Sequence, residues 1–185
     1  MAVLAIVDEA AIRELTAKMA EERARLIAQF EALSEADAEL APADGEGEEQ
    51  WSPKQQCAHL AEMESAYRAW VERALAEDNP DVGRLRGDPV AIPIEEAQSR
   101  SIADLAAQMC EQRERTLALI ATLTPEQYER TASQPMFGTL TVLQWLRSYY
   151  RHDRMHQAQI AGRQADYQPR FVGGKEPDQR RERLT

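Results

Sequence analysis

Residues 141–160 read TVLQWLRSYYRHDRMHQAQI, and this stretch decides the class of fold. Residues suited to the buried face of a helix recur along it at intervals of three or four: Val142, Trp145, Tyr149, His152, His156 and Ile160. Thr141 is followed three residues later by Gln144, a pair typical of a capping box at a helix start. The stretch therefore predicts a helix from Thr141 to about Arg163 with two histidines on its buried face.

Three earlier segments have the same helical period. They span residues 8–33, 52–76 and 101–123, and Ser52, Pro53 and Gln55 form a second start signal. Little glycine in a chain of 185 residues favours helix over strand. We therefore predict an all-α, four-helix bundle over residues 1–165, with a polar tail at residues 166–185.

A long connection separates the second and third predicted helices. It spans residues 78–100 and contains Pro80, Gly83, Gly87, Pro89 and Pro93. A connection of more than about 15 residues is far longer than a tight helical hairpin needs. We therefore expect a crossover, so that these two helices need not be antiparallel neighbours.

Charge and composition exclude several classes of protein. The net charge of −10 argues against a nucleic-acid partner, which favours a basic surface. No apolar run approaches the roughly 20 residues that span a bilayer, and the apolar N-terminus lacks the basic residues of a signal peptide. The two cysteines, Cys57 and Cys110, form no CxxC pair. We expect a cytoplasmic protein that binds neither membrane nor nucleic acid.

The three histidines of the chain suggest a metal site. His152 and His156 are four residues apart, so they share one helix face and can reach one cation. His59 lies at the edge of the buried stripe of the second helix, from which an imidazole can reach across to a facing helix. The alternative is that each histidine is an ordinary buried residue with its own hydrogen bond. The pattern alone leaves both interpretations open.

Two stretches resemble the DinB/YfiT-like superfamily. The first is WSPKQQCAHL at residues 51–60, and the second combines FGTLTVL at residues 137–143 with the motif His152-x-x-x-His156-x-x-Gln159-Ile160. The resemblance implies a bundle of up-down-down-up topology and a homodimer. It also implies a site in which His59, His152 and His156 bind one divalent metal ion, nickel or zinc. Members of the family include thiol-dependent transferases and proteins described as metal-dependent hydrolases.

The resemblance leaves three functions open. Thiol transfer, which we place first, would use the metal to activate a low-molecular-weight thiol, with Arg84, Arg86 or Arg151 as candidates to hold its carboxylate. Hydrolysis would activate water and needs a base, for which Glu62 and Asp153 are candidates. The third possibility is a stress-related metal-binding protein without catalysis.

Tyr149 is a further candidate site residue. It lies one turn before His152 on the same stripe, where its hydroxyl group could donate to a ligand at the metal, although we favour packing in the core as its role.

Overall fold

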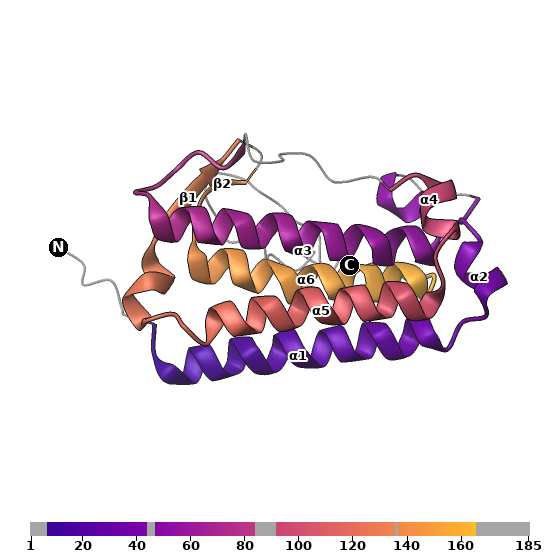
Figure 1. Cartoon of the computed structure of the whole chain (residues 1–185), viewed down its shortest axis with the longest axis horizontal. Helices are drawn as coiled ribbons and strands as arrows, with labels where there is room; N and C mark the ends of the chain where they lie inside the picture. Colours follow the sequence, from indigo (N-terminus) through magenta and orange to yellow (C-terminus); the bar gives the residue numbers. More distant parts are fainter. Residues whose placement is uncertain (1–6, 44–46, 84–91, 136, 166–185) are drawn as a thin grey trace, which may run out of the picture.

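The computed structural model describes residues 7–43, 47–83, 92–135 and 137–165. Within these residues, four long helices lie side by side along the molecule (Figure 1): α1 (Glu9–Glu31), α3 (Pro53–Ala76), α5 (Ile102–Ile120) and α6 (Val142–Ile160). Helices α1 and α6 run in one direction and α3 and α5 in the other (Figure 1). The predicted four-helix bundle with up-down-down-up topology is confirmed.

Shorter elements connect the long helices. They are α2 (Glu35–Glu39), the 3₁₀ helices η1 (Gly47–Gln50) and η3 (Pro125–Glu129), α4 (Ile94–Gln98), and the strands β1 (Thr131–Gln134) and β2 (Gly138–Thr141). The two strands pair antiparallel, with Thr131 opposite Thr141, and they lead directly into α6. The expectation of little strand structure is confirmed.

The helix starts follow the capping signals, whereas three of the four helix ends were predicted too late; α3 ends at Ala76 as predicted. Ser52 and Thr141 both form complete capping boxes. The first helix was predicted to reach Leu33, but α1 ends at Glu31, because Ser34 caps the separate helix α2. The third and fourth helices also end three residues earlier than predicted. Gly162, with φ +63°, adopts the left-handed conformation that ends α6.

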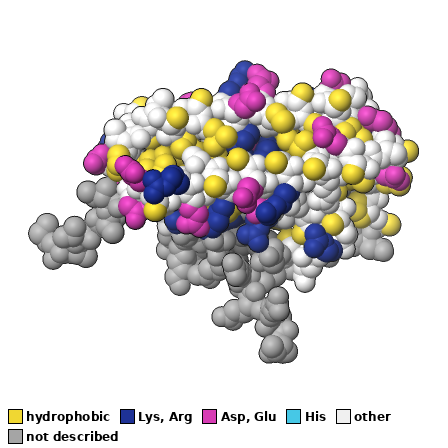
Figure 2. Space-filling model, turned by 90° about the horizontal axis from the view of Figure 1, so that it is seen from below, with side chains coloured by type: hydrophobic (Ala, Val, Ile, Leu, Met, Phe, Trp, Pro, Cys, Tyr) yellow, Lys and Arg dark blue, Asp and Glu magenta, His cyan; other side chains and the backbone are white. Residues whose placement is uncertain are grey.

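The outer faces of the helices have the mixed character of a solvated bundle. Acidic and basic side chains are interspersed with apolar ones on the face seen in Figure 2. Exposed charged side chains also form ion pairs within a helix, such as Arg13–Glu9 in α1 and Arg115–Glu111 in α5. Such exposed pairs contribute little to stability. In the described part of the chain, no helix combines the length and the apolar character needed to cross a membrane.

A network of four buried charges joins the four long helices. Arg23 of α1 contacts Asp153 of α6 at 2.8 and 3.1 Å and Glu64 of α3 at 2.7 Å. Arg113 of α5 contacts the same two carboxylates, at 2.8 Å each. All four side chains are at most 4% exposed. Two positive and two negative charges thus compensate one another directly.

Each of the two arginines also donates a hydrogen bond to a backbone carbonyl of the other's helix, which links α1 and α5. Arg23 donates to the carbonyl of Met109, four residues before Arg113, and Arg113 donates to the carbonyl of Met19, four residues before Arg23. Each guanidinium group therefore bonds both carboxylates and the backbone of the opposite helix. This arrangement fixes the relative height and rotation of the helices, because any slip would leave a buried charge unpaired.

The network predicts a large effect for Arg113→Met. Removing this guanidinium leaves two buried carboxylates with one cation, and loss of one partner from a buried ion pair costs about 3–5 kcal/mol. We expect the free energy of unfolding, measured by urea denaturation with circular dichroism, to fall by this amount. The matched control is Arg115→Met, which removes an exposed partner from the same helix and should change little. Equal effects of the two variants would contradict the role given to the network.

Candidate metal centre

The three histidines converge between α3 and α6. His152 and His156 lie on successive turns of α6, and His59 faces them from α3. The Nε2 atom of His152 is 3.3 Å from Nε2 of His59 and 3.0 Å from Nε2 of His156. His59 and His156 are fully buried, whereas His152 is partly exposed. Residues almost a hundred positions apart in the sequence therefore direct nitrogen atoms at one point.

A fourth group, the carboxylate of Glu48, completes the cluster. Its Oε1 is 3.8 Å from Nε2 of His59, and its Oε2 is 3.8 Å from Nε2 of His156. One oxygen of Glu48 and one nitrogen from each histidine all lie within 4.8 Å of one another. The sequence analysis missed Glu48, because it stands among several acidic residues in a loop segment. The only available signal was its position three residues before Trp51.

These four side chains fit a divalent cation. A tetrahedral ion with bonds of 2.0–2.1 Å holds its ligand atoms about 3.3 Å apart. The histidine separations of 3.0 and 3.3 Å match this spacing. Imidazole nitrogen and carboxylate oxygen are ligands of zinc, nickel and related ions. The arrangement is therefore ready for a metal without rearrangement of the helices.

The environment keeps the histidines in the form that binds metals. Burial and the neighbouring His59 lower the pKa of His152 to about 3. Burial, followed by the effect of His152, holds the pKa of His156 well below its usual value. Both rings are therefore neutral at neutral pH, and a neutral imidazole has a lone pair available for a cation.

Gln56 orients His156. Its Oε1 lies 3.1 Å from Nδ1 of His156, while its amide nitrogen donates to the carbonyl of Trp51 at 3.0 Å. Because the amide nitrogen is engaged by a carbonyl, Oε1 accepts a hydrogen bond from Nδ1 of His156. The Nε2 lone pair then faces the cluster, and such hydrogen-bond partners typically support metal-binding histidines. Trp51 also packs edge-on against His59, with ring centres 4.8 Å apart. The sequence analysis did not identify Gln56.

The two predicted bases lie in different surroundings. Asp153 belongs to the buried charge network; burial would raise its pKa, but Arg23 and Arg113 outweigh this effect and hold its pKa below the usual value. Its carboxylate is therefore engaged by two guanidinium groups. Glu62 is partly exposed on α3 and does not belong to the group of ligand atoms around the histidines.

Tyr149 adjoins the centre on the side of the charge network. It lines a space too narrow for a water molecule, together with Arg23, Leu60, Glu64, Tyr67, His152 and Asp153. Its hydroxyl group is buried and has no hydrogen-bond partner among the described residues. Burial raises its pKa well above the usual value, so the hydroxyl group keeps its proton.

The remaining candidates lie away from the centre or outside the described residues. Arg84 and Arg86 belong to residues 84–91, which the structure does not describe. Arg151 is buried. Both cysteines are free thiols; Cys57 is buried, which raises its pKa, and Cys110 is exposed on α5.

Comparisons with known proteins agree with this architecture. A family model described as the DinB superfamily matches residues 11–160. The fold is similar to that of YfiT from Bacillus subtilis, described as a probable metal-dependent hydrolase with an unusual four-helix bundle topology. The two share 19% sequence identity and a TM-score of 0.68, over 88% of this chain and 90% of YfiT. A comparison with curated proteins finds no match.

The neutral histidines predict a pH dependence of stability for the metal-free protein. The pKa values of His152 and His156 are lower in the folded chain than in the unfolded chain. Below about pH 6.5 the unfolded state therefore binds more protons, and the free energy of unfolding falls as the pH falls. Each histidine contributes up to about 1.4 kcal/mol per pH unit in this range. Urea denaturation in the presence of a chelator, from neutral pH towards pH 5, measures the slope.

The control for this prediction is the double variant His152→Gln and His156→Gln. The pKa of Glu48 is raised by burial, so Glu48 acts on stability with the opposite sign in the parent protein. The difference between the parent and the double variant isolates the histidines. Identical slopes for the two proteins would show that the histidines titrate normally in the folded state.

The unpartnered hydroxyl group of Tyr149 predicts that Tyr149→Phe is tolerated or stabilising. A buried hydroxyl group without a partner costs about 1–3 kcal/mol, and the phenylalanine removes this cost while keeping the ring. Tyr128→Phe is the matched control, because the buried hydroxyl group of Tyr128 does contact a carbonyl, that of Ile120 at 3.4 Å. Thermal melts should place Tyr149→Phe at or above the parent and Tyr128→Phe at or below it. A marked loss of stability in Tyr149→Phe would mean that the hydroxyl group has a partner.

Proposed function

This chain belongs to the DinB superfamily, and from that premise we propose that it is a divalent-metal-dependent hydrolase of a small molecule. The observation that carries the proposal is the convergence of three imidazoles, with Nε2 separations of 3.0 and 3.3 Å, beside a carboxylate. A chain of 185 residues can bury a hydrophobic core that is large enough for folding without a bound metal. A metal held here would therefore contribute to catalysis more than to stability. Zinc and nickel are the ions that we propose.

Each residue of the centre has a distinct task in this proposal. His59, His152 and His156 would hold the cation through their Nε2 atoms, and Gln56 fixes the ring of His156. When bound, a divalent cation supplies Lewis acidity, which lowers the pKa of a coordinated water or thiol. The helices α3 and α6 bury the rings of His59 and His156, which strengthens electrostatic interactions within the site.

Glu48 supplies the proton acceptor that hydrolysis requires. Hydrolysis needs a proton acceptor beside the attacking water. The sequence suggested Glu62 or Asp153 for this role, but the carboxylate that lies beside the histidine nitrogens is that of Glu48. Its side chain is 25% exposed, so it lies on the side from which water and substrate arrive. The description of YfiT as a probable metal-dependent hydrolase is consistent with this choice.

Thiol transfer is the second candidate. Glu48 would accept a proton from a thiol as well as from water, so the same centre supports this reaction. A biological thiol with carboxylates also requires a cationic group nearby. Of the buried arginines, Arg23 and Arg113 are already paired with Glu64 and Asp153. Arg151 is buried. Because the described residues offer no clear support for binding such a thiol, we place thiol transfer second.

The metal content of untagged protein tests the proposal. We expect about one equivalent of zinc or nickel in the parent and a strong loss in His156→Ala, because two imidazoles bind a cation much more weakly than three. Cys110→Ser is the control for metal bound by the exposed thiol and should equal the parent. Equal metal in the parent and in His156→Ala would remove the assignment.

An activity panel separates the reactions. The metal-loaded protein should hydrolyse a member of a panel of esters, amides and phosphoesters without added thiol, and His156→Ala should not. Consumption of a thiol with an electrophile, in place of hydrolysis, would establish the second candidate. Protein that binds metal but is inactive in both assays would support a binding protein without catalysis.

A further inference from the structure

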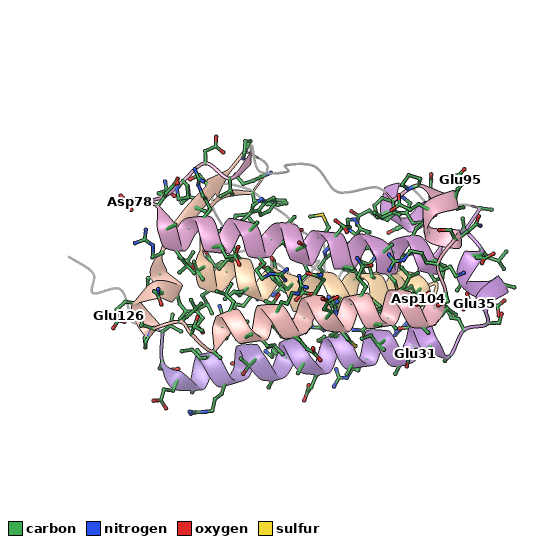
Figure 3. All side chains as sticks on the ribbon, in the orientation of Figure 1. Glu31, Glu35, Asp78, Glu95, Asp104 and Glu126 are labelled. Carbon is green, nitrogen blue, oxygen red and sulfur yellow. The ribbon has the colours of Figure 1, made fainter. Side chains whose placement is uncertain are left out.

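Glu48 differs from the surface carboxylates of this acidic chain in its surroundings. Its neighbour Glu49 is exposed, and the six acidic side chains labelled in Figure 3 lie near the ends of the bundle. The side chain of Glu48 is three-quarters buried, at 25% exposure. A buried carboxylate of this kind requires a compensating partner.

The polar neighbours of Glu48 are histidines. Among the described residues, the ion-pair contacts of Glu48 are with His59 and His156, and neither a lysine nor an arginine takes part in these contacts. A metal ion between the carboxylate and the ring nitrogens would supply a fixed positive charge.

The geometry of the carboxylate matches this role. Its two oxygens approach different histidines, Oε1 towards His59 and Oε2 towards His156, each at 3.8 Å. The carboxylate therefore spans the same space that the three nitrogens enclose. Its contacts are about half an ångström longer than the 3.3 Å between His59 and His152, so it stands slightly further out.

Glu48 is also held differently from the histidines. The histidines belong to α3 and α6, two long helices locked by buried charges, whereas Glu48 belongs to the four-residue 3₁₀ helix η1. A carboxylate on a short turn, on the more exposed side of the cluster, can leave without disturbing the core.

We propose that Glu48 is a fourth and displaceable ligand, which occupies at rest the coordination position that an anionic group of the substrate takes and which can accept a proton once it is displaced. This inference rests on the proposed metal site and adds the substrate class. A group that replaces a carboxylate should itself be an anionic donor, such as a carboxylate, a phosphoryl oxygen or a thiolate. Substrates or products with such a group therefore compete directly with Glu48.

Metal affinity tests the first half of the proposal. The variants are Glu48→Gln, which removes the charge and keeps the shape, and the matched control Glu49→Gln from the exposed neighbouring position. Titration with Co²⁺, followed by its visible absorption, should give a dissociation constant at least about tenfold higher for Glu48→Gln, the scale of effect seen when groups around a metal site are changed. Glu49→Gln should match the parent. Melting temperatures without metal verify that both variants fold.

Binding of small anions tests the second half. Acetate, inorganic phosphate and 2-mercaptoethanol represent the three kinds of donor, and each is titrated into Co²⁺-loaded protein. Removing a competing carboxylate increases the fraction of open sites, so at least one probe should bind Glu48→Gln about tenfold more tightly than the parent or Glu49→Gln. The probe with the largest gain identifies the donor that the site prefers.

Each outcome decides between the proposals. Unchanged Co²⁺ affinity in Glu48→Gln, together with metal loss in His156→Ala, would overturn the inference and leave the three-histidine site intact. Weaker Co²⁺ binding without tighter anion binding would show that Glu48 is a fixed ligand and overturn its displacement. Full Co²⁺ affinity in His156→Ala would overturn the metal site and this inference with it.

Discussion

The buried network of Arg23, Glu64, Arg113 and Asp153 is the constraint on which the remaining structure depends. Apolar helix faces can slide or rotate past one another at modest cost, whereas a buried charge without its partner costs several kcal/mol. One member of the network comes from each long helix. The network therefore selects one register and one set of helix rotations from the many that the hydrophobic stripes would tolerate.

The network and the metal centre are linked through α6. Consecutive residues of a helix point about 100° apart, because a turn contains 3.6 residues. When Asp153 faces the arginines of α1 and α5, His152 is directed elsewhere, towards His59 of α3. His156 follows one turn later on the same side. On α3, Glu64 likewise faces the two arginines, whereas His59 faces the histidines of α6. The ion pairs that close the bundle thus also direct the imidazoles towards one point.

The two clusters solve the problem of buried polar groups differently. In the network, opposite charges compensate one another within the protein, so the cluster is complete as it stands. In the metal centre, burial suppresses the charge of His152 and His156 and leaves their lone pairs near a carboxylate. Such a group of buried ligand atoms is typical of a site that binds a further ion or molecule. The fold that surrounds both clusters is that of the superfamily, but the chemistry follows from the residues of the site.

The sequence by itself determined the class of the fold and the identity of the converging imidazoles. Helical periodicity and capping pairs such as Thr141 and Gln144 are local signals, so they located the four helices and most of their starts. The stripe position of His152 and His156, together with the resemblance carried by residues 51–60, also singled out the three histidines.

The tertiary structure alone decided which polar side chains meet. The sequence made Asp153 a candidate base, but in the structure its carboxylate pairs with two arginines that lie 40 and 130 positions away in the sequence. Glu48 stands in an acidic loop segment without periodicity, and Gln56 is an ordinary helix residue by composition. Their roles depend on distances between helices, which no local pattern encodes, because the same sequence letters would have the same local preferences on either face of the bundle.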